Sequence, residues 1–270
     1  MNSLRLNCND SQPLVSIVTT CFNASKTIER TFQSVLDQTY ANYEYWVIDA
    51  ASRDGTIELV KRFQLRFGDR MKFQSEPDKG IYDGFNKGVS RCSGELIGIL
   101  NADDWFEPDT LERVVAAYQS HPEVGLFYGI SRSRSEGGAQ ELGLSRRHHS
   151  QLSQKMTGHP GVFISKCAYQ KYGLYSLKYR VAADYDLMLR LQQGGVPFFG
   201  IDHILVNSCI GGDSDRMQLT GDLESAAIRL RCGFISSFRY RRLVVQAWRN
   251  HLRRSLKAYC VRLFGGGNTG

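Results

Sequence analysis

The alternation of short apolar segments with amphipathic, helix-length segments is the feature that most constrains how this chain can fold. Four apolar segments that are typical of buried strands are found at 14–20, 43–48, 71–74 and 96–100. Between them, apolar residues recur at helical spacing. Repeating strand–helix units of about 25–30 residues are typical of a doubly wound parallel sheet. The sequence therefore predicts an α/β fold.

Polar residues follow each of the four strands at the point where a parallel sheet binds its ligands. Thr20 ends the first strand, Asp49 follows the second, and Asp78 lies shortly after the third. Asp103 and Asp104 follow the fourth. Right-handed crossovers bring the carboxyl ends of such strands to one edge, and ligands bind in the crevice beyond that edge. The pattern predicts a nucleotide-binding crevice.

Asp103 and Asp104 are adjacent carboxylates that come directly after a buried strand. Two such groups repel one another unless a cation or hydrogen-bond donors lie between them. Hard oxygen ligands here favour Mg²⁺ or Mn²⁺, which usually bind together with phosphates. The alternative is a turn whose acids cap the helix that begins near Pro108 and Asp109.

The glycine-rich phosphate-binding motifs of other nucleotide-binding folds are missing after the first strand. The segment CFNAS at 21–25 matches neither the P-loop nor the dinucleotide-binding pattern. It also lacks the Lys, Arg or Gly with which a sugar nucleotidyltransferase would hold a triphosphate. That enzyme class is therefore the weaker alternative to the one that the next motifs indicate.

Several stretches resemble, in the same order, the successive motifs of family 2 glycosyltransferases. They are SIVTTCFN (16–23), DAASRDGT (49–56), EPDKGIYD (76–83) with NKG (86–88), and LNADD (100–104). Three later stretches resemble the acceptor-side motifs of the colanic-acid and exopolysaccharide branch of that family: HPG (159–161), ADYDL (183–187) and GG (211–212). The resemblance implies a GT-A fold, with a Rossmann-like, mostly parallel sheet and helices on both faces.

Carried over position by position, the resemblance implies a nucleotide-sugar donor and a divalent cation, Mg²⁺ or Mn²⁺. Thr20 and Asp49 would hold the nucleobase and ribose, and Asp78 would lie beside the nucleotide. Asp103, together with Asp104, would bind the metal and the ribose. Asn101 stands where the family's Asp-x-Asp motif has its first acid. Its amide oxygen can ligate a metal but brings no charge.

Asp184 matches the catalytic base of the family. In an inverting transfer, such a carboxylate takes the proton of the acceptor hydroxyl as its oxygen attacks the anomeric carbon. The family usually has Glu before this residue; Ala183 stands there, so a supporting acid is missing or is supplied by Asp186. Lys87 is a candidate for the diphosphate or a solvated helix lysine, and His159 a candidate for metal or acceptor contact or a structural loop histidine.

The basic character of the chain belongs to its C-terminal part. Ten of the 34 Lys and Arg residues lie from Ser225 onward, where there is no Asp or Glu. The rest of the chain has 24 basic against 27 acidic residues, so the net charge of +7 arises in the tail. A nucleic-acid groove across the whole protein is therefore not expected. A non-catalytic module with a nucleic-acid-binding tail is the alternative of a different class.

The segment 239–264 predicts a basic amphipathic helix with aromatic residues, which is typical of a helix lying on anionic lipid. The alternative is that its apolar stripe packs on the catalytic domain. A membrane-surface enzyme suits a saccharide acceptor carried on a polyprenyl-diphosphate lipid. The resemblance and this tail predict a glycosyltransferase of cell-surface polysaccharide biosynthesis, peripheral on the inner face of the plasma membrane.

The expected organisation is a polar N-terminal segment (1–13), a GT-A domain (14–214) and a basic helical tail (215–270). Within the domain, 14–107 would form the nucleotide-binding half and 108–214 the acceptor-side half, in which two late strands are expected at 196–199 and 204–210. No apolar run approaches the ~20 residues of a membrane span, and the N-terminus has no signal-peptide core. Seven scattered cysteines without a Cys-x-x-Cys pair indicate reduced thiols and a cytoplasmic protein.

Overall fold

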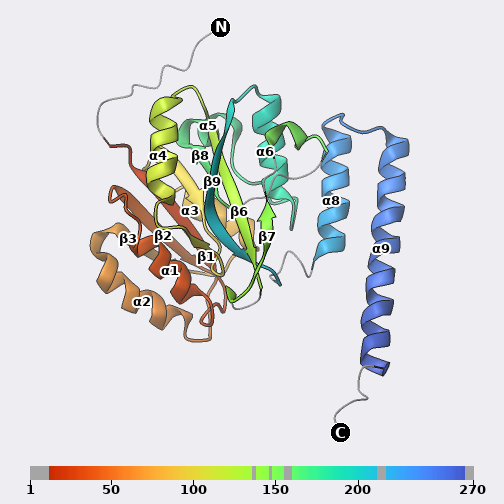
Figure 1. Cartoon of the computed structure of the whole chain (residues 1–270), viewed down its shortest axis with the longest axis horizontal. Helices are drawn as coiled ribbons and strands as arrows, with labels where there is room; N and C mark the ends of the chain where they lie inside the picture. The colour runs from red at the N-terminus through yellow and green to blue at the C-terminus, as the bar shows by residue number, and fades with distance from the viewer. Residues whose placement is uncertain (1–11, 136–137, 146–147, 155–159, 212–216, 265–270) are drawn as a thin grey trace.

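The computed structural model describes residues 12–135, 138–145, 148–154, 160–211 and 217–264, and the side chains up to residue 256. The chain forms a mixed β-sheet with helices on both faces, and helices α8 and α9 lie beside it (Figure 1). The strands are β1 (Val15–Cys21), β2 (Tyr43–Asp49), β3 (Met71–Ser75), β4 (Leu96–Ile99), β5 (Trp105–Phe106), β6 (Leu126–Arg134), β7 (Glu141–Ser145), β8 (Val162–Ser165) and β9 (Phe198–Cys209). The helices are α1 (Ile28–Leu36), α2 (Thr56–Phe67), α3 (Ile81–Val89), α4 (Thr110–Ser120), α5 (Lys166–Tyr172), α6 (Ala183–Gln193), α8 (Gln218–Arg231) and α9 (Ser237–Phe264).

The sheet has the strand order β3-β2-β1-β4-β8-β6-β9-β5, with β7 paired to β6. The first four strands are parallel, as predicted, because a helix crosses back after each of β1, β2 and β3. Strand β8 is antiparallel to both of its neighbours, β4 and β6. The half of the sheet that the chain forms after β4 is therefore mixed.

The carboxyl ends of the parallel strands meet at one edge of the sheet. Cys21 at the end of β1 is paired with Asp49 at the end of β2, and Asp49 is paired with Ser75 at the end of β3. On the other side of β1, Val18 is paired with Ile99 at the end of β4. This register brings the polar strand ends of the sequence to the same edge.

Each face of the sheet has its own hydrophobic core. Helices α1, α2 and α4 cover one face, where the fully buried Phe32 packs against Tyr45 and Phe63. Helices α3, α5 and α6 cover the other, where Tyr185 is fully buried and Ile228 of α8 packs into the same core. Burying about 25 cal/mol per Å² of apolar surface on both faces is the main source of stability for such a layered fold.

The C-terminal strands differ from the expectation. The sequence suggested two strands, at 196–199 and 204–210, but a single strand, β9, runs through both. Its pairing with β6 shifts register between Tyr128 and Ser131, and the residues around Asp202 and His203 are exposed there. The polar residues between the two expected strands thus lie at an irregularity within one strand.

Helix α8 is part of the folded core rather than of a separate tail beginning at residue 215. Ala226 and Ile228 are buried, and Ile228 belongs to the core on the α6 side of the sheet. Helix α9 lies alongside α8, farther from the sheet (Figure 1). Within the described part of the chain, no helix combines the length and the apolar character that a membrane span requires.

Candidate active site

The loops after β1 and β2 are organised around Asp49. Its carboxylate is fully buried and accepts hydrogen bonds from the amide (3.0 Å) and hydroxyl (2.5 Å) of Ser52 and from the hydroxyl of Ser75 (2.6 Å). The Ser52 hydroxyl in turn accepts from the amide of Asn23 (2.8 Å). Asn23 and Ala51 have φ values of 50° and 60°, a left-handed conformation that only firm surroundings hold. Asp49 therefore fixes the shape of these loops, and its direct contact with a nucleotide stays a prediction.

Thr20 and Asp78 lie next to one another because α3 packs closely on the end of β1. A Cβ atom added at Gly84 would lie 2.8 Å from Thr20 Cγ2 and 3.4 Å from Asp78 Oδ2. Only glycine allows this approach. Asp78 Oδ1 accepts a hydrogen bond from the amide of Gly80, just before α3 begins (2.9 Å). The structure thus brings together these two residues predicted on the nucleotide side.

Lys87 is occupied by contacts with its own helix and with the loop before it. Its Nζ lies 3.0 Å from Glu76 and 3.5 Å from Asp83, and it donates to the carbonyl of Pro77 (2.9 Å). These contacts tie the loop before α3 to the helix. They give Lys87 a structural role and do not support the predicted contact with a diphosphate.

The loop that carries Asp103 is held from α1. Arg30 lies over the ring of Trp105, with Cζ 3.5 Å from the ring centroid, and Nη2 donates to the carbonyl oxygen of Asp103 (3.4 Å). Thr31 donates to the carbonyl oxygen of Asp104 (2.7 Å). The backbone of the acidic turn is thereby fixed, while the Asp103 side chain is partly exposed.

The side chain of Asp104 is held by contacts within the protein. Its side chain is buried and accepts hydrogen bonds from the amide of Cys209 at the end of β9 (3.0 Å) and from Asn101 Nδ2 (3.1 Å). Burial and the neighbouring charge of Asp103 raise the pKa of Asp104 to about 8. Because both carboxyl oxygens accept hydrogen bonds from the protein, Asp104 joins the acidic turn to β9, and these contacts do not support the predicted role of Asp104 as a metal ligand.

The remaining oxygens of this turn fit a divalent cation. Asn101 Oδ1 is buried and has no hydrogen-bond partner among the described residues, whereas its Nδ2 bonds Asp104. No cluster of three or more His, Cys, Asp or Glu side chains suited to a metal is found in the described part of the chain. Mg²⁺ is often held by only one or two carboxylates together with substrate phosphates. Asp103 and Asn101 Oδ1 suit such a site.

Asp184 lies in the first turn of α6 and is joined to α3. Its Oδ1 accepts hydrogen bonds from the hydroxyl of Tyr82 (3.1 Å) and from the amide of Tyr185 (2.8 Å). Burial and the charge of Asp184 raise the pKa of Tyr82 well above its ordinary value, so that Tyr82 is a donor. The helix that contacts Thr20 and Asp78 therefore also contacts the predicted base.

Asp186 is not the supporting acid of Asp184. It is almost fully buried, and its carboxylate pairs with Arg190 (2.9 Å) and Arg231 (2.5 Å). Since Arg231 belongs to α8, this buried ion pair joins α6 to α8. Asp186 is thus a structural residue.

Glu224 is a residue that the sequence analysis missed. From α8, its carboxylate accepts hydrogen bonds from three consecutive backbone amides just before α6, those of Arg180, Val181 and Ala182. One signal was available in the sequence, because Glu224 is the last acidic residue before the basic tail. Tyr82 lies within the 76–83 motif, but the motif predicted no role for it.

Three sequence predictions fall wholly or partly outside the described residues. His159 lies there, and so does Gly212 of the predicted closing Gly-Gly pair. The side chains of α9 from residue 257 onward are also outside. The roles suggested for these residues stay predictions.

The comparison with protein families decides which enzymes this chain is related to. The family model described as "Glycosyl transferase family 2" matches residues 16–176, more than half of the chain. The chain belongs to glycosyl transferase family 2. Its glycosyltransferase activity follows from that membership and from its named relatives. Asp184, Asp186 and Glu224 lie beyond the matched residues.

Two curated relatives illustrate the similarity. A PGL/p-HBAD biosynthesis glycosyltransferase of Mycobacterium tuberculosis is 31% identical over 183 residues, which cover 66% of this chain and 69% of that protein. A chondroitin synthase of Escherichia coli is 30% identical over 209 residues, which cover 76% of this chain but 30% of that synthase. The relation to the colanic-acid branch in particular stays a prediction.

Solved glycosyltransferase structures share the fold. S. aureus TarS 1–349 in complex with UDP superposes with a TM-score of 0.65 at 13% identity, covering 93% of this chain and 75% of that one. The mannosyltransferase PcManGT of Pyrobaculum calidifontis, in complex with GDP-Man and Mn²⁺, gives 0.66 at 18% identity, covering 82% and 65%. The predicted GT-A fold of this family 2 glycosyltransferase is confirmed.

Proposed function

We propose that this family 2 glycosyltransferase is an inverting, metal-dependent enzyme that transfers a sugar from a nucleotide-diphosphate sugar to a saccharide hydroxyl. The observation that carries the proposal is the position of Asp184. Its carboxylate is bonded to Tyr82 of α3 (3.1 Å), and Gly84 of the same helix packs against Thr20. A carboxylate is thereby placed near the nucleotide side of the sheet edge.

Different residues of the chain would have different roles in the transfer reaction. Thr20 and Asp78 would contact the nucleoside, and Asp49 would act through the loops that it shapes. Asp184 would accept the proton of the acceptor hydroxyl while the oxygen bonds to the anomeric carbon and the nucleoside diphosphate leaves with the electron pair of the broken bond. One displacement of this kind inverts the anomeric configuration.

Asp103 and Asn101 Oδ1 would hold the divalent cation. Bound there, Mg²⁺ or Mn²⁺ would stabilise the negative charge that accumulates on the departing diphosphate. The structure of PcManGT in complex with GDP-Man and Mn²⁺ supports this part of the proposal by likeness. The partly exposed Asp103 and the unpartnered Asn101 oxygen support it from the chain itself.

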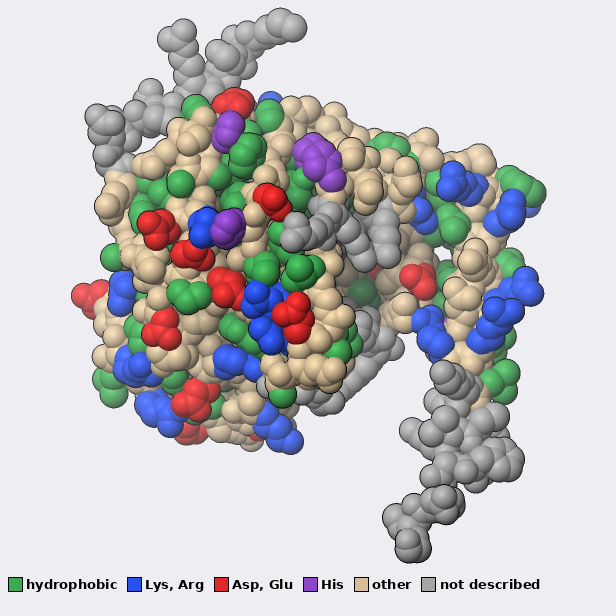
Figure 2. Space-filling view, in the orientation of Figure 1, with side chains coloured by type: hydrophobic (Ala, Val, Ile, Leu, Met, Phe, Trp, Pro, Cys, Tyr) green, Lys and Arg blue, Asp and Glu red, His purple; other side chains and the backbone are tan. Residues whose placement is uncertain are grey.

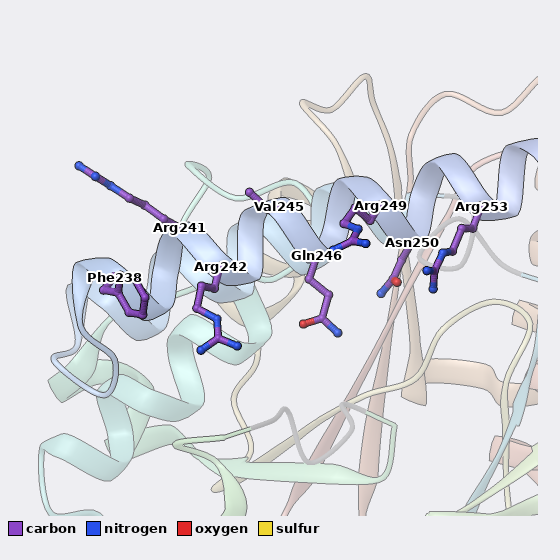
Figure 3. A pocket seen from close by; sticks show the side chains of 8 residues that line it. All are labelled: Phe238, Arg241, Arg242, Val245, Gln246, Arg249, Asn250 and Arg253. Atoms are coloured by element: carbon purple, nitrogen blue, oxygen red, sulfur yellow. The ribbon is translucent and has the colours of Figure 1, made fainter.

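The outer face of α9 supports the proposal that the enzyme acts at an anionic membrane surface. Five large apolar side chains of this helix are exposed: Phe238, Val245, Trp248, Leu252 and Leu256. Four arginines alternate with them along the helix: Arg241, Arg242, Arg249 and Arg253. Figure 2 shows this mixture of basic and hydrophobic side chains along α9, and Figure 3 shows Phe238, Arg242 and Arg253 along the helix. A helix face with arginines around exposed apolar side chains is suited to bind anionic lipid.

The inner face of α9 makes a different contact. Ala247 is buried and Leu243 is half-buried against α8, and Arg254 donates a hydrogen bond to Gln218 of α8. Both alternatives for the tail therefore find support, on opposite faces of one helix. A peripheral enzyme at the inner face of the plasma membrane would suit an acceptor carried on a polyprenyl-diphosphate lipid, in the synthesis of a cell-surface polysaccharide.

A donor screen tests the proposed reaction. The full chain would be incubated with Mn²⁺ or Mg²⁺ and a panel of UDP- and GDP-sugars, and free nucleoside diphosphate would be quantified. The anomeric configuration of the released sugar or of the product would be read by NMR. We expect nucleoside diphosphate from one donor and an inverted anomer. Release of pyrophosphate from a nucleoside triphosphate and sugar phosphate would instead indicate a nucleotidyltransferase, and retention would contradict the single displacement.

A further inference from the structure

Helix α8 brings a carboxylate to the backbone turn that leads into the predicted catalytic base. Glu224 Oε1 accepts a hydrogen bond from the amide of Arg180 (2.8 Å). Its Oε2 accepts from the amides of Val181 and Ala182, both at 2.9 Å. Charge-assisted bonds of this kind are stronger than those between neutral groups. Asp184 is two residues beyond this turn.

The electrostatics of the turn favour a charged acceptor. The first N–H groups of a helix lack partners within the helix and give that end a partial positive charge. Glu224 binds the amides that directly precede α6, so that its charge complements this end. A glutamine in its place would offer one oxygen, and its NH₂ group would face a backbone donor. The contact thus requires the carboxylate.

Glu224 completes a set of contacts that holds the turn from two sides. The hydroxyl of Tyr82 in α3 shares its one proton between two acceptors, the carbonyl of Val181 (2.5 Å) and the carboxylate of Asp184 (3.1 Å). From α8, Arg231 bonds the hydroxyl of Tyr179 (3.0 Å) and the carboxylate of Asp186 (2.5 Å). The position of Asp184 therefore depends on α3 on one side and α8 on the other.

We infer that Glu224 is a positioning residue for the transfer reaction, which holds the 180–182 turn so that Asp184 keeps its orientation toward the acceptor. The inference rests on the proposed function, because it assumes that Asp184 is the base. It assigns a role in the active site to a helix that lies outside the residues matched by the family model. The acid that supports Asp184 would therefore be Glu224, acting through this turn, and not Asp186.

The test compares Glu224→Gln and Glu224→Ala with Asp222→Asn, a matched control that removes an exposed carboxylate from the same helix. Each full-length variant would be assayed with the donor that gives the highest rate with the unaltered chain. The measurements are kcat, the KM for that donor, the affinity for the corresponding nucleoside diphosphate with Mn²⁺, and amide hydrogen exchange in a peptide covering residues 176–186.

We expect both Glu224 variants to lower kcat roughly 10- to 100-fold, because small displacements of a catalytic group have effects of this size. KM and nucleotide affinity should stay within about twofold, since an orienting contact acts on the chemical step. Exchange in the 176–186 peptide should become faster, and Asp222→Asn should change none of these quantities.

Two results would overturn the role of Glu224 alone, with the unaltered chain active. One is an unchanged kcat in both variants, and the other is a loss of nucleotide affinity in proportion to the loss of kcat, which indicates general damage to the fold. An unaltered chain that transfers no sugar from any donor would overturn the proposed function, and this role with it.

Discussion

Tyr82 and Asp184, which are 102 residues apart in the chain, are joined by a hydrogen bond of 3.1 Å from the phenol hydroxyl to the carboxylate. Tyr82 is in α3, whose Gly84 packs against Thr20 at the end of β1, and Asp184 lies in the first turn of α6. The bond therefore connects the side predicted to bind the nucleotide with the side predicted to bind the acceptor. Catalysis by Asp184 should depend on it.

Replacing Tyr82 with phenylalanine should lower kcat roughly 10- to 100-fold, because a hydrogen bond to a charged group contributes about 1.5–3 kcal/mol. The KM for the donor should change little. Tyr169→Phe is the control, since it removes a buried hydroxyl that bonds Tyr175 at 3.0 Å. Steady-state kinetics of both variants checks the prediction, and equal losses in the two would contradict a specific role for Tyr82.

Asp103→Asn should lower the rate of nucleoside diphosphate release by roughly 100-fold or more, because it removes the carboxylate expected to hold the cation. A chelator should abolish release by the unaltered chain, and Mn²⁺ or Mg²⁺ should restore it. Asp109→Asn, which breaks a surface ion pair with Arg113, serves as the control. Activity that persists in a chelator would be evidence against metal dependence.

Asp186→Asn should mainly reduce stability. Its buried carboxylate pairs with Arg190 and Arg231, and loss of this charge leaves the two arginines without the carboxylate that they pair with. We expect the free energy of unfolding to fall by about 2–4 kcal/mol, discounted from a fully buried pair because the arginines are partly exposed. Urea unfolding measures this, with the exposed Asp69→Asn as control. A stable Asp186 variant with a much lower kcat would instead indicate a catalytic role.

The outer face of α9 should bind vesicles that contain anionic lipid. Replacing Arg241, Arg249 and Arg253 with glutamine should weaken partitioning roughly 100-fold, at about 1 kcal/mol for each basic residue near the surface. The control removes the same charge from α2, which lies on the far side of the sheet (Figure 1): Lys61, Arg62 and Arg66 to glutamine. Vesicle sedimentation and Trp248 fluorescence report binding. Equal effects of the two triple variants would contradict a specific membrane face.

The parallel half of the fold could be predicted because its signals are local. Each strand such as Val15–Cys21 is short, apolar and followed by a helix with clear periodicity. Strand β5 has two residues, and its pairing with β9 joins Trp105 to Asn207, a distant contact that no local pattern encodes. The continuity of β9 was missed for a similar reason, since only its pairing with β6 reveals it.

The types of residue at the site could also be predicted, but not all of their partners. Asp184 and Asp103 follow from the motifs that they match. The burial of Asp104 depends on the amide of Cys209, and the pairing of Lys87 depends on how the loop at Glu76 folds back. Glu224 contacts a turn more than forty residues earlier. The Glu224 contact arises from the packing of α8 on α6, which no local sequence pattern reveals.

The most direct test of the account is the turnover of Asp184→Asn with the donor that the unaltered chain uses, together with its affinity for nucleoside diphosphate and Mn²⁺. If Asp184 is the base, nucleoside diphosphate release should fall at least roughly 100-fold, because asparagine cannot accept the proton. Nucleotide affinity should be retained. A variant that turns over at nearly the rate of the unaltered chain would contradict the assignment of Asp184 and the mechanism built on it.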